Sequence, residues 1–296
     1  MSYEQFLYVI GYPVSHSKSP DMYNALYQSL GLPWSYAIKE IPTPDEAEDF
    51  VRNGDYLSIN ITTPYKPLAL ACADEKSATC IALGGANVLI RQGEGPDKKL
   101  VAHNTDGLGC VSYLKREGAH FEGSDVVVCG TGPTALSILF ALTQAQVASA
   151  TLLGRDEARA NSVLAGFCER VGKQDCKLQA GSYETSRDNL VRASIIIDAT
   201  TLGMKADDPA PFDTSLLNPS QWVMDVVYGH GETALVKGAL EHECTVFDGR
   251  GMLVGQAVET AYLVAQAAEV TLQAPYDELF DVMASAAFGS GTMELS

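Results

Sequence analysis

Short apolar runs of strand length alternate with helical patterns along almost the whole chain, and this alternation limits the fold more than any other feature. The run FLYVIGY (6–12) precedes the helical pattern SPDMYNALYQSLG, and WSYAIKEI (34–41) precedes TPDEAEDFVRNG. Such alternation is typical of a mostly parallel β-sheet covered by helices on both faces. Two successive sets of this kind predict an α/β fold of two domains.

The same alternation predicts the domain boundaries. We expect a first domain over residues 1–105 plus 249–288, a second over 106–248, and a disordered polar tail over 289–296. The last two helical patterns have no strand after them, so we expect these C-terminal helices to pack back onto the first domain. Ser19 and Thr43 each stand before a proline and a helical pattern, and both are predicted to be helix N-caps.

The charge balance excludes some partners. Twenty basic and 37 acidic residues give a net charge of −17 at pH 7, so neither a nucleic acid nor an anionic membrane surface is expected to bind. The seven cysteines form no CxxC pair and no metal-ligand spacing, so no metal site is expected. The N-terminal stretch is too polar for a leader or a membrane span, and reduced thiols suit a cytoplasmic protein.

A glycine turn between a buried strand and an apolar helix indicates a dinucleotide-binding site. In VVVCGTGPTALS (126–137), the first glycine would allow the tight turn and the second the approach of backbone amides to a pyrophosphate. An alanine stands at the third glycine position, and the proline fits a first helical turn. An ordinary strand–helix turn would give the same match. The predicted cofactor-binding residues of this turn are Gly130, Thr131, Gly132, Pro133, Thr134 and Ala135.

Charged residues after the next strand bear on the choice of cofactor. Arg155 and Arg159 lie four residues apart, where a Rossmann fold meets the adenosine ribose, and two guanidinium groups there could hold a 2′-phosphate. Asp156 and Glu157 beside them could instead bind the free ribose diol of NAD. The arginine pair favours NADP, and NAD is the alternative.

The stretch SINITTPYKPLAL (58–70) ends an apolar strand at a proline and then places a single lysine, Lys66. A lysine is ordinarily a solvated surface residue. Together with six further motifs, however, this stretch resembles the shikimate dehydrogenase family. The motifs are GYPVSHSKSP (11–20), NITTPYK (60–66), GGANVL (84–89), HNTDG (103–107), DATTLGM (198–204), DVVY (225–228) and DGRGMLVGQAVE (248–259).

The resemblance implies an N-terminal α/β substrate domain, a Rossmann dinucleotide-binding domain, and reversible NADP(H)-dependent conversion between 3-dehydroshikimate and shikimate. Lys66 and Asp106 match the catalytic acid–base pair. The substrate-binding positions are matched by Ser17, Ser19 and Tyr228 for the carboxylate, and by Thr62, Lys66, Asn87, Asp106 and Gln256 for the ring hydroxyls. The remaining matches to cofactor contacts are Thr200, Thr201, Val226, Gly249 and Met252. Helix capping by Ser19 and core packing of Met252 are the alternative roles of these two residues.

Several residues depart from the family pattern. Asp198 stands where the family often has asparagine, Gly154–Arg155–Asp156 replaces the frequent Asn-Arg-Thr loop, and Pro67 replaces an acidic residue. These departures suggest a divergent member that accepts quinate or a related acid. The alternatives to a shikimate dehydrogenase are therefore an NAD-dependent quinate/shikimate dehydrogenase and a paralogue that senses shikimate or a dinucleotide without turnover. We expect a monomer or a homodimer.

Overall fold

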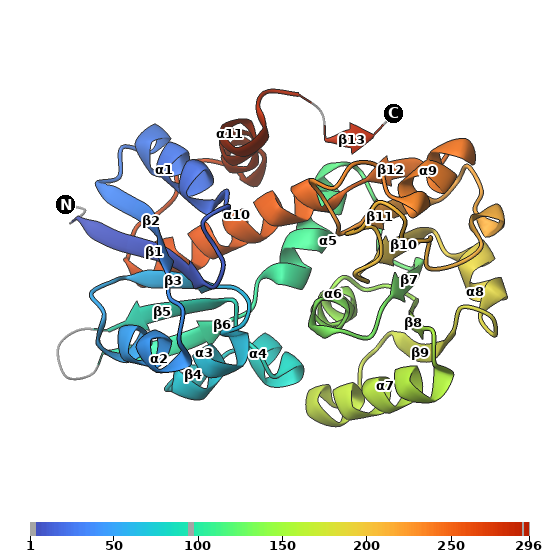
Figure 1. The fold of residues 1–296 in the computed structure, drawn as a ribbon, viewed down its shortest axis with the longest axis horizontal. Coiled ribbons are helices and arrows are strands. Elements are labelled where there is room, and N and C mark those ends of the chain that lie inside the picture. The colour runs from blue at the N-terminus through green and yellow to red at the C-terminus, as the bar shows by residue number, and fades with distance from the viewer. Residues whose placement is uncertain (1–3, 94–97, 292, 296) are drawn as a thin grey trace. The chain divides into compact units, whose positions relative to one another are not determined.

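The structure is a computed structural model that describes residues 4–93, 98–291 and 293–295. Its backbone contacts divide the chain into two compact units, Met1–Thr105 with Val254–Gly291 and Asp106–Leu253 with Thr292–Ser296. The predicted second boundary is Gly249, the first residue of a helix, whereas the division between the units falls within that helix. The elements of each unit are labelled in Figure 1.

The first unit contains a six-stranded mixed sheet. Its strands are β1 (Gln5–Gly11), β2 (Trp34–Glu40), β3 (Ser58–Ile61), β4 (Glu75–Lys76), β5 (Val88–Gln92) and β6 (Lys99–His103), in the order β2-β1-β3-β5-β6-β4. β1 is parallel to β2 and β3, whereas β5 is antiparallel to β3 and β6. The predicted sheet was mostly parallel. This one is mixed because the β5–β6 connection is too short for a parallel crossover, which needs about a dozen residues.

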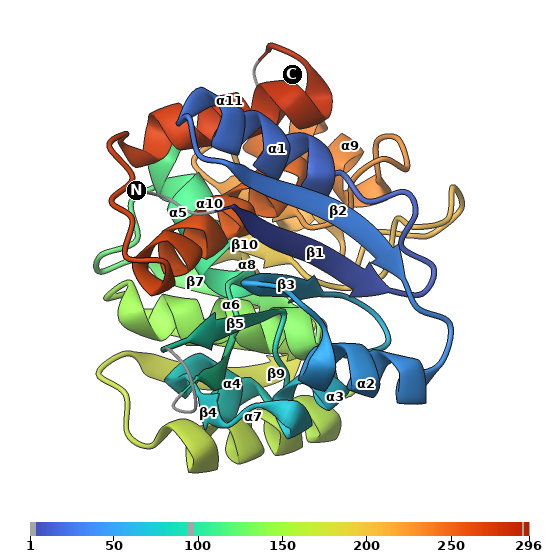
Figure 2. The ribbon, with the colours of Figure 1, turned by 90° about the vertical axis from the view of Figure 1, so that its left-hand side faces the viewer.

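Helices cover this sheet on both sides. They are α1 (Ser19–Ser29), α2 (Pro44–Asn53), α3 (Lys66–Cys72), α4 (Ala78–Leu83), the part of α10 (Gly249–Ala267) from Val254 onward, and α11 (Tyr276–Phe288). Figure 2 shows α1 and α11 together on one side of the sheet and α2 and α3 on the other. The contact between α1 and α11 confirms that the C-terminal helices pack back onto the first domain.

Only one of the two predicted N-caps is correct. Thr43 caps α2, because its Oγ1 accepts a hydrogen bond from the backbone N–H of Glu46 at 3.3 Å. Ser19 is instead the first residue of α1, and Lys18 occupies the cap position. The reason is local: the Oγ of Ser17 already accepts from the Ser19 N–H, at 3.2 Å, so the preceding serine supplies the oxygen.

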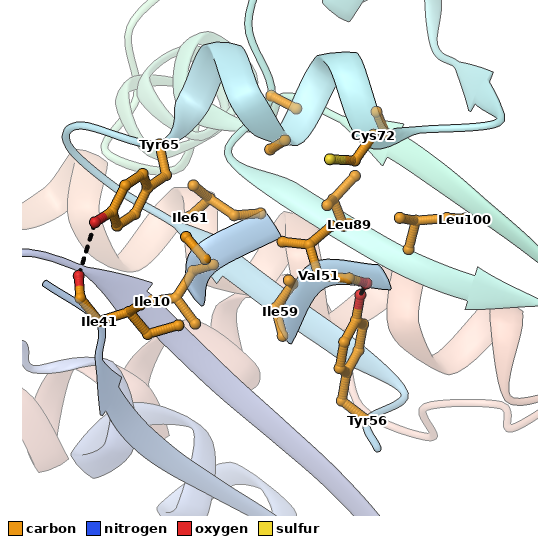
Figure 3. Close-up of a cluster of buried hydrophobic side chains, with 14 of the residues drawn as sticks. Ile10, Ile41, Val51, Tyr56, Ile59, Ile61, Tyr65, Cys72, Leu89 and Leu100 are labelled. Carbon is orange, nitrogen blue, oxygen red and sulfur yellow. Dashed lines mark hydrogen bonds between the residues drawn. The ribbon is translucent and has the colours of Figure 1, made fainter. Parts of the chain in front are cut away.

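A hydrophobic core fills the space between the sheet and helices α2 and α3 (Figure 3). Ile10, Ile59 and Leu89 contribute from three strands, and all three are fully buried. Tyr65 enters the same core from the turn before α3, and its hydroxyl donates to the carbonyl of Ile41 at 2.8 Å. The turn that precedes Lys66 is therefore anchored to the core of the unit.

The second unit contains a seven-stranded sheet with a Rossmann strand order. Its strands are β7 (Asp125–Cys129), β8 (Ser149–Gly154), β9 (Lys177–Ser182), β10 (Ile195–Asp198), β11 (Trp222–Asp225), β12 (Thr245–Phe247) and β13 (Glu294–Leu295). All neighbouring pairs from β9 to β12 are parallel, in the order β9-β8-β7-β10-β11-β12. Counted from β7, this order is 3-2-1-4-5-6, which confirms the predicted Rossmann fold.

Part of the C-terminal tail belongs to this sheet. β13 pairs antiparallel with β12, the strand that would otherwise form the edge, and Met293 before it is buried. This differs from the disordered tail predicted over 289–296, of which residues 292 and 296 lie outside the described chain. An edge strand offers unpaired backbone groups, and a short polar tail can therefore be ordered by pairing with them.

Helices α5 (Asp106–Arg116), α6 (Pro133–Gln144), α7 (Glu157–Val171), α8 (Arg187–Arg192) and α9 (Ala234–Glu241) belong to the second unit. α5 and α6 approach closely at Gly107, whose N–H donates to the Ser137 Oγ at 2.7 Å. A Cβ on Gly107 would lie 1.9 Å from the Ser137 carbonyl oxygen, so only glycine fits. None of the helices in the described residues has the length and apolar character that crossing a membrane requires.

The anchoring role of Tyr65 can be tested by Tyr65→Phe. The variant leaves the buried Ile41 carbonyl without this donor, so we expect the free energy of unfolding to fall by roughly 1–3 kcal/mol. Tyr12→Phe, which changes a tyrosine with 49% exposure in the same unit, is the control and should be neutral. Urea unfolding curves measure both, and equal stability of the two variants would contradict the anchoring role.

Candidate functional site

The segment that carries Lys66 is held by hydrogen bonds on both sides. The Thr62 N–H donates to the Ile10 carbonyl at 3.0 Å, and the Tyr65 N–H donates to the Thr62 carbonyl at 2.9 Å, which closes the turn. Lys66 is the first residue of α3 rather than the end of the strand, and it is half-buried. Its carbonyl accepts from the Ala86 N–H at 3.2 Å, so α3 is tied to the GGANVL segment.

The loop that carries Ser17 and Ser19 begins beside Thr62. A Cβ on Gly11, at the end of β1, would lie 2.5 Å from the Thr62 Cγ2, so glycine is required for this approach. The Ser17 Oγ donates to the Ser19 Oγ at 3.1 Å, and Ser19 is 7% exposed. The two predicted carboxylate-binding serines are thus in direct contact, and their hydroxyl groups form one small polar cluster.

A directed chain of hydrogen bonds orients Asn87. Its Oδ1 accepts from the Thr105 N–H at 2.9 Å, and its Nδ2 donates to the Thr105 Oγ1 at 3.0 Å. The Thr105 and Thr260 hydroxyl oxygens are 3.1 Å apart, and the Thr260 hydroxyl donates to the Gln256 carbonyl at 2.8 Å. A hydroxyl has one hydrogen, so Thr260 must accept from Thr105. The chain therefore connects two predicted ligands of ring hydroxyls, Asn87 and Gln256, and all four residues are buried.

A second buried polar group lies in the same unit. The Tyr36 hydroxyl donates to the Asn60 Oδ1 at 2.8 Å, and the ring of Tyr23 stacks on that of Tyr36 with centroids 4.4 Å apart. Asn60 lies in β3, two residues before Thr62, which directly follows the strand. The sequence-based predictions of site residues do not include Asn60, Tyr36, Thr105 or Thr260. The period of two along β3 and the four-residue spacing of Gln256 and Thr260 on a helix were the available signals.

Asp106 and Tyr228 belong to the second unit. Asp106 directly follows Thr105 and begins α5, so it lies in a different unit from Lys66. The pairing of Lys66 with Asp106 stays a prediction. Tyr228 is 37% exposed and lies against the start of α10, because a Cβ on Gly249 would come within 3.1 Å of its Cδ1.

The same close packing gathers part of the predicted cofactor set. A Cβ on Gly249 would lie 1.9 Å from the Val226 carbonyl oxygen, so these two residues are in contact and position 249 requires glycine. Met252 follows one helical turn later and is buried, with 9% of its surface exposed. Val226 and Gly249 follow neighbouring parallel strands, β11 and β12.

The glycine turn has the geometry expected of a dinucleotide-binding loop. Gly130 has φ +108°, and a Cβ there would lie 2.9 Å from the Ala199 carbonyl oxygen. Gly132 is the N-cap residue of α6, with nothing within 4 Å of the position that a Cβ would occupy, and Pro133 lies at the start of the helix. Ala135 is buried, whereas Thr131 and Thr134 are partly exposed. The turn thus presents backbone at the positive end of a helix, where an anion is stabilised.

The structure gives Asp156 a defined local role. Its Oδ1 accepts from the Arg159 N–H at 3.1 Å, so this carboxylate caps α7. Arg155 and Arg159 are both exposed, one at the end of β8 and one in the first turn of α7. The carboxylate is used in capping, and the guanidinium groups are accessible to a ligand.

Asp198 explains the conformation of the loop that contains Thr200 and Thr201. Its Oδ1 accepts from the Thr200 N–H at 2.9 Å, and the Thr200 Oγ1 accepts from the Leu202 N–H at 3.1 Å. Thr201 is exposed and Thr200 is partly so. Burial, together with the neighbouring Asp225 carboxylate, raises the pKa of Asp198 to about 7.

Comparison with known proteins identifies the family. Residues 9–89 match the family model described as the shikimate dehydrogenase substrate binding domain. The shikimate dehydrogenase (NADP(+)) of Alkaliphilus metalliredigens strain QYMF is 32% identical over 262 residues, which cover 86% of this chain and 89% of that protein. The chain belongs to the shikimate dehydrogenase family.

Solved structures of the family have the same fold. The shikimate 5-dehydrogenase of Thermus thermophilus, in complex with NADP(H) and shikimate, is 27% identical, with a TM-score of 0.76 and coverage of 95% of this chain and 99% of that one. The quinate dehydrogenase of Corynebacterium glutamicum, in complex with NAD, is 25% identical, with a TM-score of 0.79 and coverage of 96% and 100%. This fold is therefore shared by a shikimate dehydrogenase and a quinate dehydrogenase.

The hydrogen-bond chain predicts energetic coupling between Thr105 and Thr260. Thr260→Val removes the acceptor of the Thr105 hydroxyl while keeping side-chain volume, and we expect a loss of roughly 1–3 kcal/mol in unfolding free energy. Thr105→Val breaks the same bond. The double variant should therefore lose less than the sum of the two single losses. Chemical unfolding of all four proteins measures the coupling, and additive losses would show that the two hydroxyls do not interact.

Proposed function

We propose that this chain is an NADP(H)-dependent shikimate dehydrogenase, which interconverts 3-dehydroshikimate and shikimate. Family membership and the activity named for its relative from Alkaliphilus metalliredigens support the proposal. The observation that carries it is the buried chain from Asn87 through Thr105 and Thr260 to Gln256. A ring with several hydroxyl groups needs fixed, individually oriented polar partners in a desolvated site. These hydrogen bonds orient the Asn87 side chain and hold the backbone of Gln256.

The substrate ligands divide by chemistry. In the proposed site, Ser17 and Ser19 donate from their hydroxyl groups to the substrate carboxylate, with help from Tyr228. Hydroxyl groups are neutral donors, and together they can bind a carboxylate without an arginine. The ring hydroxyls are assigned to Thr62, Lys66, Asn87, Asp106 and Gln256. The orientation of Asn87 is fixed before the substrate arrives, which reduces the entropy lost on binding.

The residues of the second unit fit a dinucleotide. The turn Gly130–Ala135 would hold the pyrophosphate with backbone amides, Arg155 and Arg159 would hold the 2′-phosphate, and the remaining contacts are assigned to Asp156, Thr200, Thr201, Val226, Gly249 and Met252. The strand order supports this placement, because ligands of open α/β sheets bind at the carboxyl ends of the strands. When bound, NADPH supplies the hydride that reduces the ketone carbon.

Lys66 and Asp106 are proposed to transfer the proton to and from the substrate oxygen. When the ketone carbon gains a hydride, its oxygen must gain a proton, and an ammonium group can donate one. In the reverse direction the neutral amine or the carboxylate accepts the proton of the alcohol. The Lys66 backbone is fixed by the anchored turn and by the hydrogen bond from the Ala86 N–H. The side-chain amine therefore extends from a rigid part of the backbone. Either Lys66 alone or the coupled pair of Lys66 and Asp106 serves as the acid and base.

An NAD-dependent quinate dehydrogenase is the second candidate. The likeness to the enzyme from Corynebacterium glutamicum supports it, as does the replacement of the frequent Asn-Arg-Thr loop by Gly154–Arg155–Asp156. The free thiols of all seven cysteines suit the cytoplasm, and we propose that location together with a monomeric or homodimeric state.

Initial rates with NADP or NAD against shikimate or quinate test the proposal. We expect the highest kcat/KM for NADP with shikimate, and Arg155→Ala should raise the KM for NADP much more than that for NAD. Arg170→Ala, in the last turn of the helix that Asp156 caps, is the control and should leave both constants unchanged. A preference for NAD with quinate would support the second candidate. Absence of turnover with every pair would contradict both enzymes and favour a paralogue that senses shikimate or a dinucleotide.

The acid–base role of Lys66 predicts a separation of turnover from binding. Lys66→Ala should lower kcat by roughly 10²- to 10⁴-fold, while shikimate affinity stays within about tenfold. Lys76→Ala removes an exposed lysine of the same unit and should behave as wild type. Stopped-flow turnover and equilibrium shikimate binding measure the two quantities, and near-normal kcat in Lys66→Ala would eliminate the mechanism.

A further inference from the structure

A buried carboxyl group lies beside the dinucleotide turn without a complete set of partners. Asp198 is the last residue of β10 and is 1% exposed. Its Oδ1 accepts from the Thr200 N–H, but within the described residues its Oδ2 has no hydrogen-bond partner. An ionised carboxylate in this position would leave one charged oxygen desolvated and unsatisfied, which is costly.

A second buried carboxyl group lies next to it. Asp225 pairs with Asp198 in the register of β10 and β11, and it is also 1% exposed. Both of its oxygens act as acceptors, Oδ1 from the Val227 N–H at 2.9 Å and Oδ2 from the Thr233 hydroxyl at 2.6 Å. Burial raises the pKa of Asp225, and hydrogen bonds at both of its oxygens oppose that rise, whereas only one oxygen of Asp198 accepts a hydrogen bond. The proton that two adjacent carboxylates need therefore belongs to Asp198.

The other titratable groups around Asp198 do not compensate its charge. Cys129 faces it from β7, and burial raises the pKa of this thiol well above its ordinary value. Tyr183, which follows β9, has a phenol whose pKa is raised chiefly by burial and lowered by Arg155. Both groups are neutral at pH 7. Asp198 thus meets a negative neighbour, Asp225, and two neutral ones.

The position of Asp198 connects it to the cofactor. The Ala199 N–H donates to the Cys129 carbonyl at 2.9 Å, and Cys129 directly precedes Gly130. A Cβ on Gly130 would lie 2.9 Å from the Ala199 carbonyl oxygen and 3.3 Å from the Thr200 nitrogen. The loop that Asp198 organises is therefore in contact with the first glycine of the turn, where the proposed function places the anionic pyrophosphate.

We propose that Asp198 is a proton-binding site coupled to dinucleotide binding, so that the protonated protein binds the dinucleotide more tightly and ionisation of Asp198 weakens binding. The proposal rests on the proposed use of a dinucleotide. Its physical basis is the added negative charge beside a pyrophosphate, in a site of low dielectric constant. Coupling is reciprocal, so binding of the dinucleotide takes up protons near and above neutral pH.

The decisive experiment measures the Kd of NADPH by its fluorescence from pH 5.5 to pH 9, without shikimate. Asp198→Asn keeps the shape of the side chain and removes its charge. Asp125→Asn makes the same change at the opposite, amino end of the neighbouring strand β7. The 2′-phosphate of NADPH titrates near pH 6, so the signal is the difference between proteins rather than one profile.

We expect the Kd of the wild type and of Asp125→Asn to rise between pH 6 and pH 9 by at least about threefold more than that of Asp198→Asn. Parallel profiles of the wild type and Asp198→Asn overturn the inference and leave the proposed function intact. Failure of the wild type to bind NADPH at every pH overturns the proposed function, and the inference with it.

The stability of the protein without any cofactor reports the same proton. Because the folded-state pKa of Asp198, about 7, exceeds the ordinary value of 3.8, the folded state holds a proton that the unfolded state has lost. This group therefore costs stability as pH rises from about 4 to about 7. The difference in Tm between Asp198→Asn and the wild type should increase in favour of the variant as pH rises across this window. The difference between Asp125→Asn and the wild type should not show the same increase. Parallel Tm curves for Asp198→Asn and the wild type overturn the proton site.

Asp225→Asn keeps the proposal testable if Asp198→Asn does not fold. Removal of the neighbouring negative charge lowers the pKa of Asp198, so the pH at which NADPH binding weakens should shift downward. An unchanged midpoint contradicts the coupling between the two carboxyl groups and overturns the assignment of the proton.

Discussion

Hydrogen bonding between parallel strands is the constraint on which both parts of the candidate site depend. Parallel neighbours end at the same edge of a sheet, so the loops that follow them are gathered there without any further interaction. In the first unit, β1 and β3 lead to the Ser17 loop and to the Thr62–Lys66 turn. In the second unit, β7, β8, β10, β11 and β12 lead in turn to the glycine turn, Arg155, Thr200, Val226 and Gly249.

The antiparallel strands of the first unit add to the same edge. β5 is antiparallel to β3, so its first residue, Val88, pairs with Asn60 near the end of β3, and Asn87 precedes it there. β6 is antiparallel to β5, so its last residue, His103, returns to the same position, and Thr105 follows. The mixed sheet thus places residues before a strand and residues after a strand at one edge, which a purely parallel sheet would not do.

Buried polar groups at these sheet edges determine how side chains are oriented and which protonation state is stable. The side chains of Asn87, Thr105 and Thr260 and the backbone carbonyl of Gln256 are joined in a single directed series of hydrogen bonds, so burial of these polar groups costs little and the three side chains are oriented. Asp198 is the opposite case, because one oxygen has no hydrogen-bond partner in the described structure and a second buried carboxyl group, Asp225, lies beside it. The hydrogen-bonded series around Thr105 favours a rigid structure. At Asp198, by contrast, the protonation state of the carboxyl group depends on the charges near it.

The sequence by itself determined the strand–turn–helix units, the glycine turn that indicates a dinucleotide-binding domain, and the motifs that carry Lys66, Asn87 and Gln256. These features are local, because periodicity and turn chemistry act over a few residues. Tertiary structure alone decided the link between Thr105 and Thr260, 155 residues apart, the register that sets Asp198 against Asp225, and the pairing of the tail with β12. Each of these depends on the register and packing of distant segments, which no local pattern encodes. The same limit explains the error at Ser19: the residue types there predicted a cap, but which serine supplied the oxygen depended on the path of the preceding loop.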